Sequence, residues 1–280
     1  MTLHIRPEEI GAPLDEATRY TLGMPHLDPI GLSENWLWKE LGHRHWSLIA
    51  RRMGRAAAGF GPGSEQPIYA AFRRIALRGG DLGAVGENDV LAVRSTLTHL
   101  SGTRVESRHV VEHRDRLVAD VGMTSVFVRR QTGGVNRSIA RVHIEGAHRV
   151  GSVVDRPVEA SVRTPDDRPA SEAEQDEVEI GTVSVEPCPH LDFNGAGLLY
   201  FCSYIAAVDR AEWHLIGKSN GLSSVKERRV VFHSNIEVGD DLVVQILAAP
   251  GGAASKHRSR VFASSDGRLL AEVETRKGPF

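Results

Sequence analysis

The chain has 280 residues, enough to bury one large core or two of ordinary size. Hydrophobic residues make up 41% of it and charged residues 25%, the balance of a soluble globular protein. The net charge of −2 provides no basic field for nucleic acid or an anionic membrane. No run reaches the roughly 18 apolar residues of a membrane-spanning helix, and the first residues lack the apolar core of a signal peptide. We therefore expect a cytoplasmic protein.

The sequence indicates neither nucleotide hydrolysis nor a metal centre. No glycine-rich phosphate loop joins a strand to a helix. His43 and His45 lie two residues apart in a helical pattern, so their side chains point roughly 200° apart and cannot share an ion. We predict no metal and no tightly bound cofactor. The two cysteines, Cys188 and Cys202, are expected to be reduced thiols.

The first regular element predicted is a helix, preceded by residues 1–22, which show little pattern. Ser33 is a suitable N-cap, and Glu34 lies in the first turn, where the helix dipole favours a negative charge. Gly54 fits the end of the helix. The helical spacing is carried by Trp36, Leu37, Leu41, Leu48, Ile49 and Met53.

Four strands are predicted after this helix, because apolar stretches there are separated by short groups of turn residues. Residues 131–159 show no pattern that favours one element. Residues 164–179 are rich in proline and acids and are typical of a solvated linker. The four strands are expected at residues 68–78, 89–100, 103–113 and 116–129.

The second half begins with a predicted strand near residues 182–187. A loop with proline and histidine then leads through residues 192–197 into about 20 residues that are apolar on nearly every side. A helix of that kind is expected to be buried, and backbone N–H groups at its start can face a ligand. Four more strand-like stretches follow, separated by short polar turns.

An internal repeat relates the two halves. Three segments of the first half recur in the second half in the same order, which indicates two copies of one unit. One long helix wrapped by an antiparallel sheet is the hot-dog fold. We therefore predict an α+β protein with a double hot-dog fold, in which two long central helices are each wrapped by an antiparallel sheet. The matching segments are 25–28 with 189–192, 85–89 with 238–241, and 116–121 with 268–273.

This repeat divides the chain into an N-terminal hot-dog half at residues 1–162, an acidic linker at 163–179 and a C-terminal half at 180–280. A lone half would leave a sheet edge exposed, so the halves are expected to pair side by side. The start of each helix then lies next to the other half. We therefore expect the site at the seam between them.

The start of the second helix resembles a known family. Residues 192–204, DFNGAGLLYFCSY, are similar to the second half of the leinamycin-type bifunctional acyltransferase/decarboxylase, a double hot-dog family of polyketide biosynthesis. Residues 69–72, YAAF, followed by RGG at 78–80, resemble its first half. The resemblance implies that methylmalonyl passes from coenzyme A to a tyrosine and is decarboxylated there. The propionyl group, or an acetyl group from malonyl, then moves to the phosphopantetheine arm of an acyl carrier protein.

The resemblance points to Tyr69 as that tyrosine, since it is the only tyrosine in the corresponding strand. A shifted register would place Arg73 there instead, which would favour simpler thioester chemistry. Acyl transfer to Tyr69 would need a deprotonated hydroxyl or a nearby base, because a free phenol titrates near ~10. A buried core tyrosine with a satisfied hydroxyl is the alternative.

Decarboxylation of a malonyl-type thioester requires hydrogen-bond donors to the enolate oxygen. Asn194 and Gly195 are predicted to supply backbone N–H groups at the helix start, since glycine permits close approach. The same two residues also fit an ordinary turn, in which Asp192 would cap the helix.

Other activities remain open. Glu34 paired with His26 or His190 would give a dehydratase, although the helix dipole alone also explains Glu34. Asp192 could activate water in a thioesterase. A non-catalytic protein that binds acyl-pantetheine is a further alternative.

The expected substrate is a thioester of coenzyme A or phosphopantetheine, and the expected partners are acyl-CoA and an acyl carrier protein. A homodimer is expected only by analogy with the fold, and we expect no nucleic-acid or membrane partner. Most exposed basic side chains are simply solvated. Those predicted to bind the phosphates of coenzyme A are Lys218, Lys226, Arg228 and Arg229.

Overall fold

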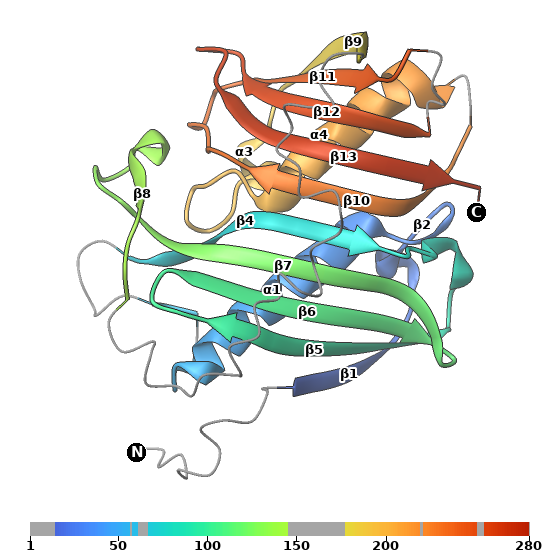
Figure 1. Ribbon diagram of the computed structural model, residues 1–280, viewed down its shortest axis with the longest axis horizontal. Coiled ribbons are helices and arrows are strands. Elements are labelled where there is room, and N and C mark those ends of the chain that lie inside the picture. The colour runs from blue at the N-terminus through green and yellow to red at the C-terminus, as the bar shows by residue number, and fades with distance from the viewer. Residues whose placement is uncertain are drawn as a thin grey trace.

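Two long helices pack against a single antiparallel sheet in the structure, a computed structural model (Figure 1). The N-terminal part of the chain forms one half of the sheet and the C-terminal part forms the other. The predicted linker at 163–179 lies outside the described part of the chain except for its last three residues. The structure describes residues 15–56, 58–60, 67–144, 177–218, 221–250 and 255–279.

The first half of the sheet surrounds helix α1 (Glu34–Arg52). Two short strands, β2 (Leu27–Asp28) and β3 (Gly31–Leu32), lead into this helix. The remaining strands are β1 (Asp15–Thr21), β4 (Tyr69–Arg78), β5 (Val90–Leu100), β6 (Arg104–His113), β7 (Arg116–Arg130) and β8 (Ile139–Arg141).

The second half surrounds helix α4 (Phe201–Glu212), which a wider turn extends through Trp213–Gly217. A four-residue helix, α3 (Pro189–Asp192), comes before it. The strands are β9 (Val178–Val185), β10 (Ser224–Phe232), β11 (Leu242–Ala248), β12 (Lys256–Ala263) and β13 (Leu269–Gly278).

Both halves have the same strand order. From the outer edge to the middle, the first half reads β1-β5-β6-β7-β4 and the second reads β9-β11-β12-β13-β10. All pairings are antiparallel, and β8 adds to β7 outside this order. The order of elements expected from the repeat, a helix followed by four antiparallel strands, is therefore found in each half.

The two halves join through β4 and β10. Residues Arg74 to Leu77 of β4 pair with Arg228 to Val231 of β10, and the pairing ends there. The N-terminal part of β4, from Tyr69 to Arg73, and the residues after Phe232 make no strand pairing across the seam. The two strands therefore separate at this end of the seam.

Helix α1 begins and ends as its sequence predicts. The Ser33 Oγ accepts a hydrogen bond from the Trp36 N–H at 3.3 Å, which caps the first turn. After the last turn, Gly54 has φ of 66°, a left-handed conformation that glycine adopts without a Cβ clash. Leu37, Leu41 and Leu48 of this helix are fully buried.

The lead-in predicted for residues 1–22 is wrong for its second part. Strand β1 occupies Asp15–Thr21 and pairs with β5 along its whole length. The sequence DEATRYT has few apolar residues, as fits an edge strand whose side chains at residues 16–21 are half-exposed or exposed. Its backbone hydrogen bonds to β5 stabilise it without a strong hydrophobic pattern.

The core lies between the helices and the sheet, and the two helices touch. An added Cβ at Gly42 of α1 would lie 2.8 Å from the ring of Phe201 of α4. Glycine is therefore needed for the helices to approach this closely. This contact brings the start of α4 against the first half of the molecule.

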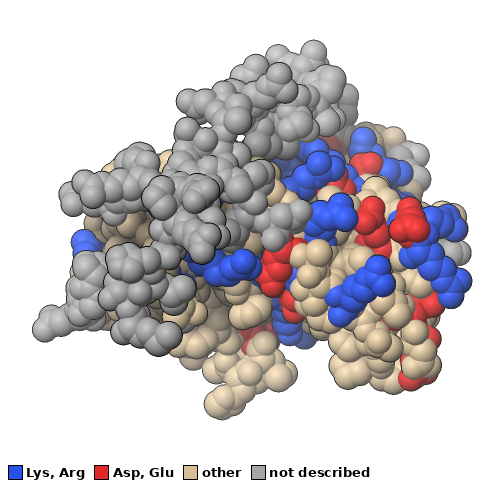
Figure 2. Space-filling model, turned by 90° about the horizontal axis from the view of Figure 1, so that it is seen from below, with Lys and Arg blue, Asp and Glu red and all other residues tan. Residues whose placement is uncertain are grey.

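On the face shown in Figure 2, basic and acidic side chains are interspersed and do not form one large patch of a single sign. Within the described part of the chain, no helix is both long enough and apolar enough to cross a membrane.

Candidate functional site

A cavity of about 510 Å³ lies at the seam, where β4 and β10 stop pairing. Its walls come from β4, the end of β7, β8, the loop before α4, the start of α4, and the residues after β10. Both halves therefore contribute, as predicted for a site at the seam. Its volume falls within the range of about 300–1,000 Å³ that small-molecule sites occupy.

The inner part of the cavity is aromatic. Phe72 of β4 and Phe201 of α4 lie with ring centroids 4.4 Å apart, and Trp46 of α1 lies 5.4 Å from Phe72. Phe232 at the end of β10 completes this wall, 6.3 Å from Phe201. Such a surface suits an acyl chain better than a charged group.

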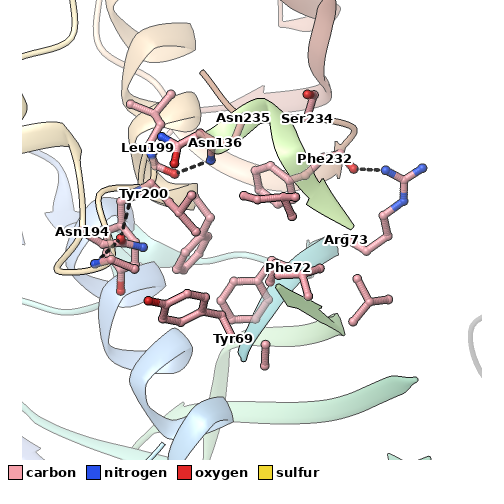
Figure 3. A pocket seen from close by; sticks show the side chains of 18 of the residues that line it. Tyr69, Phe72, Arg73, Asn136, Asn194, Leu199, Tyr200, Phe232, Ser234 and Asn235 are labelled. Carbon is pink, nitrogen blue, oxygen red and sulfur yellow. Dashed lines mark hydrogen bonds between the residues drawn. The ribbon is translucent and has the colours of Figure 1, made fainter. Parts of the chain in front are cut away.

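The outer part of the cavity is polar and positively charged. The lining side chains there include Arg141 and His233, together with Tyr69, Arg73 and Asn194, which Figure 3 labels. None of the described residues that line the cavity is an aspartate or a glutamate. The cavity therefore combines an apolar interior with a polar, cationic outer end.

Tyr69 lies where the sequence places a nucleophile. Its side chain is half-buried and extends from β4 toward the side of the cavity formed by Asn194 and Tyr200 (Figure 3). Among the described residues its hydroxyl has no hydrogen-bond partner. This geometry differs from that of a core tyrosine with a satisfied hydroxyl.

Two other tyrosines line the cavity and are less suited to attack. Burial raises the pKa of Tyr200 and of Tyr204, so both phenols stay protonated. The Tyr204 hydroxyl also donates to the Ser234 carbonyl at 2.9 Å. Tyr69 is therefore the best placed of the three tyrosines that line the cavity.

Asn194 and Gly195 line the cavity but do not lie at the helix start. The Asn194 Oδ1 accepts from the amides of Ala196 and Leu198, at 2.9 and 3.1 Å, and the Asn194 N–H donates to the Leu198 carbonyl. The loop is closed into a turn of its own. The prediction that these two amides belong to the first turn of the helix is wrong.

Helix α4 instead begins at Phe201, with Tyr200 as its N-cap. The Tyr200 amide donates to the Asp192 carbonyl at 2.8 Å, and the Ser203 amide to the Tyr200 carbonyl at 2.8 Å. The Phe201 amide donates to none of the described residues. Because Phe201 lines the cavity, this first-turn N–H is one backbone donor available for a ligand oxygen, and the Gly195 amide in the loop is another without a partner among the described residues.

The loop before α4 is anchored from the other half of the chain. The buried Asn136 side chain, after β7, donates to the carbonyls of Gly197 and Ile236, both at 2.7 Å. Arg130 donates to Asn136 Oδ1 at 3.0 Å and to the Ala196 carbonyl. These contacts fix the cavity wall across the seam.

Asp192 has a structural position. Its carboxylate accepts the Cys188 amide at 2.8 Å, and its carbonyl accepts the Ser203 hydroxyl at 2.9 Å. It is buried and does not line the cavity. The role proposed for Asp192 in activating water is therefore not supported by its placement.

Glu34 also lies away from the cavity. It accepts the Trp38 indole N–H at 2.9 Å and forms an ion pair with Arg228 at 3.1 Å. Burial raises the pKa of Glu34 to about 7, although the charge of Arg228 opposes this shift. The predicted pairing of Glu34 with His26 or His190 is not found: the His26 ring packs on Trp36 instead.

Arg228 is not available to coenzyme A, which corrects its predicted role. Its side chain is fully buried and contacts three carboxylates, those of Glu34, Asp209 and Glu212. His257 is bonded to Glu212 at 2.9 Å in the same cluster. Although burial favours the neutral acid, Arg228 and His257 hold the pKa of Glu212 well below its usual range.

This buried cluster lies at the start of α1. Glu34 is the first residue of α1 just as Phe201 is the first residue of α4. Arg228 corresponds in the repeat to Ile75, since their partners in β13 and β7 are equivalent residues. The start of α1 is therefore held by a buried ion pair, whereas the start of α4 packs on an aromatic ring beside the cavity.

The other predicted phosphate-binding residues do not line the cavity. Lys218 follows the last turn of α4, at the end opposite the cavity. Lys226 forms an ion pair with Asp81 at 3.4 Å, and Arg229 lies 3.7 Å from Glu274. The structure brings Tyr69, Asn194 and Gly195 together and leaves the remaining predicted site residues elsewhere.

Sequence reasoning missed His233 and its partner. His233 lines the cavity just after β10, and its Nε2 lies 2.9 Å from the carboxylate of Glu272 on β13. A histidine oriented by a carboxylate is the usual arrangement of a general base. The only sequence signal is HSN after an apolar strand, and Glu272 is 39 residues away.

Comparisons with known proteins show the fold. No family model and no curated protein sequence matches the chain. Its structure resembles an acyl-ACP thioesterase from Bacteroides thetaiotaomicron, with a TM-score of 0.65 and 11% identity over 94% of this chain and 98% of that one. It also resembles the 12:0-ACP thioesterase from Umbellularia californica, with a TM-score of 0.68 and 12% identity over 95% of each chain. The hot-dog fold is thus confirmed, while membership of the leinamycin-type family stays a prediction.

Proposed function

We propose that the protein is an enzyme that acts on acyl thioesters, with two hot-dog halves and one active site at their seam. The cavity carries this proposal, because its apolar interior, polar rim and helix start match the three parts of such a substrate. The acyl chain lies among Trp46, Phe72 and Phe201. The thioester carbonyl lies at the start of α4, and the pantetheine arm leaves through the cationic outer end.

Hydrolysis is the activity that the site supports best. His233, held by Glu272, takes a proton from water, whose oxygen attacks the thioester carbonyl. The Phe201 N–H donates to the oxyanion of the tetrahedral intermediate. When the intermediate collapses, the carbon–sulfur bond breaks and the thiol leaves with the proton from His233. The overall similarity in fold to acyl-ACP thioesterases agrees with this activity.

Acyl transfer with decarboxylation is the second candidate, favoured by the unpaired hydroxyl of Tyr69. In this reaction the Tyr69 oxygen attacks a malonyl-type thioester, the carbon–sulfur bond breaks, and coenzyme A leaves as the thiol. Loss of CO₂ gives an enolate that the Phe201 N–H stabilises and that a proton then quenches. The acyl group finally passes to the thiol of an acyl carrier protein.

One experiment separates the two candidates. The protein is mixed with decanoyl-CoA, malonyl-CoA and methylmalonyl-CoA, while released thiol and intact protein mass are measured. Hydrolysis predicts free acid without an adduct. Acyl transfer predicts a propionyl adduct from methylmalonyl-CoA. Turnover of none of these thioesters, with no adduct, would contradict both.

Two pairs of variants assign the residues. Tyr69→Phe removes the adduct if the tyrosine is the nucleophile, and Tyr20→Phe, which removes a hydroxyl outside the cavity, serves as its control. His233→Asn is expected to lower the rate by about 10²–10⁴-fold, the usual contribution of a general base. His43→Asn, at an exposed position on α1, should leave the rate unchanged.

A further inference from the structure

The cationic outer end of the cavity contains two arginines without acidic partners. Arg73 and Arg141 both line the cavity, and neither forms an ion pair within the described residues. Arg137, the third arginine there, is paired with Asp240 at 3.1 Å and lies near Asp266. Among the described residues, two positive charges therefore have no acidic partner beside the cavity.

Local backbone geometry turns Arg73 toward the cavity. The pairing of β4 with β7 shifts by one residue between Phe72 and Arg74, so Arg73 is the extra residue of a β-bulge. Its guanidinium donates to the Phe232 carbonyl, beyond the last pair of β4 and β10 (Figure 3). This bond fixes one N–H and leaves the other donors of the guanidinium for a ligand.

Arg141 faces the same cavity from the other side. It pairs with Val128 of β7, which in turn pairs with Tyr69 of β4. Residues directly paired in a sheet point to the same face, so Arg141 and Tyr69 share that face about 10 Å apart, two strand spacings. Arg141 is exposed and therefore lies at the mouth.

The two guanidinium groups are close enough to affect each other. Burial, together with the positive charge of Arg141, lowers the pKa of Arg73. Like charges held near each other without a carboxylate between them are unfavourable unless an anion joins them. Elsewhere in the molecule arginines such as Arg108 and Arg276 have carboxylate partners.

We propose that Arg73 and Arg141 bind the phosphate of a phosphopantetheine arm at the mouth of the cavity. This inference rests on the proposed function for the identity of the arm, and it assigns the phosphate subsite to residues other than Lys218, Lys226, Arg228 and Arg229. The exposed position of Arg141 selects the phosphate end of the arm, since a carboxylate next to the thioester carbonyl would lie deeper, near Phe201. Coenzyme A and a carrier protein can both supply this phosphate.

The test compares binding of 4′-phosphopantetheine with that of pantetheine, which differs only by the phosphate. We expect the phosphate to tighten binding by about tenfold or more, because charge-assisted hydrogen bonds to two guanidiniums are strong. The double variant Arg73→Gln/Arg141→Gln should reduce the ratio to about one without changing pantetheine binding. Arg129→Gln is the matched control, one residue from Val128 on the other face of the same hairpin.

The outcomes are distinct from those of the turnover assay, because neither ligand is a thioester. No phosphate preference in the wild type, or a preference that persists in the double variant, would overturn the subsite. Tighter binding of a non-hydrolysable analogue of malonyl-pantetheine than of the matching propionyl analogue, if lost in the double variant, would also overturn it, in favour of a carboxylate subsite. A phosphate preference without any thioester turnover would support the subsite and contradict the proposed activity. Comparing the binding of coenzyme A with the binding of an acylated carrier protein then identifies which of them supplies the phosphate.

Discussion

Two histidines in the first half show how completely a titratable side chain can be neutralised by burial. His45 of α1 bonds to the hydroxyls of Ser107 and Ser125 at 2.6 and 2.8 Å. His109 of β6 bonds to Ser107 and Ser95, both at 2.8 Å. Burial lowers the pKa of His45 to about 3 and that of His109 below its usual value.

Because these pKa values are lowered in the folded state, the unfolded chain binds protons at low pH that the folded chain does not bind. The free energy of unfolding is therefore at its full value above the unfolded pKa near 6.5 and decreases as pH falls below it. Below that pH, each histidine should lower the free energy of unfolding by up to about 1.4 kcal/mol for each pH unit of acidification. Urea unfolding of the wild type and His109→Gln between pH 6.5 and 4.5 measures the difference in slope. Equal slopes would show that His109 is protonated in the folded protein.

Some residues of the candidate site could be predicted from the sequence and others could not. Tyr69, Asn194 and Gly195 lie on segments with a recognisable pattern, and all three line the cavity. His233 and Glu272 are brought together only by the pairing of β10 with β13. A contact over this sequence separation leaves no periodic signal in either segment.

At the scale of elements, the two helices were not equally predictable. Helix α1 has a serine N-cap, an acidic first turn and a terminal glycine, and its bounds follow from these. The N-cap of helix α4 is Tyr200, a residue type that is not favoured at that position. Asn194 is a favoured type, but its side chain closes a separate turn earlier in the loop. The predicted start was therefore several residues too early.

The ion-pair cluster of Arg228 links α1, α4 and β10. Removing the cation leaves the buried Glu34 without its ion-pair partner, while Glu212 keeps His257 and Lys277, and a single uncompensated buried charge costs about 3–5 kcal/mol. We therefore expect Arg228→Leu to lower the free energy of unfolding by roughly that amount. Glu34→Gln should cost less, because Arg228 keeps Asp209 and Glu212. Urea unfolding at pH 7 measures both, and an Arg228→Leu protein as stable as the wild type would contradict this account.

At the scale of the whole molecule, the repeat in the sequence correctly predicted two halves with the same order of helix and strands. The sequence did not show that the seam is a continuous sheet or that the two helix starts have different surroundings. That difference depends on which residue meets each helix start, Phe72 at Phe201 and Arg228 at Glu34. Each pair joins residues far apart in the chain, so the asymmetry appears only in the folded protein.

This asymmetry predicts one site per chain. Isothermal titration with a non-hydrolysable thioether analogue of decanoyl-CoA should give a stoichiometry near one. At the start of α1, Glu34 is paired with the buried Arg228, whereas the start of α4 faces the cavity. A stoichiometry near two would mean that the start of α1 also opens in solution.

The central claim is that the seam cavity is where acyl thioesters react, and blocking the cavity tests it most directly. Ala71 of β4 lines the cavity with a half-buried side chain, so Ala71→Trp fills it with an indole ring. Ala17→Trp, at an exposed position on β1, is the control. We predict that thiol release from the acyl-CoA panel falls at least about 100-fold in Ala71→Trp, as expected when the reacting carbonyl can no longer reach its place, and is unchanged in Ala17→Trp. A folded Ala71→Trp protein that releases thiol at the wild-type rate would show that the reaction takes place elsewhere.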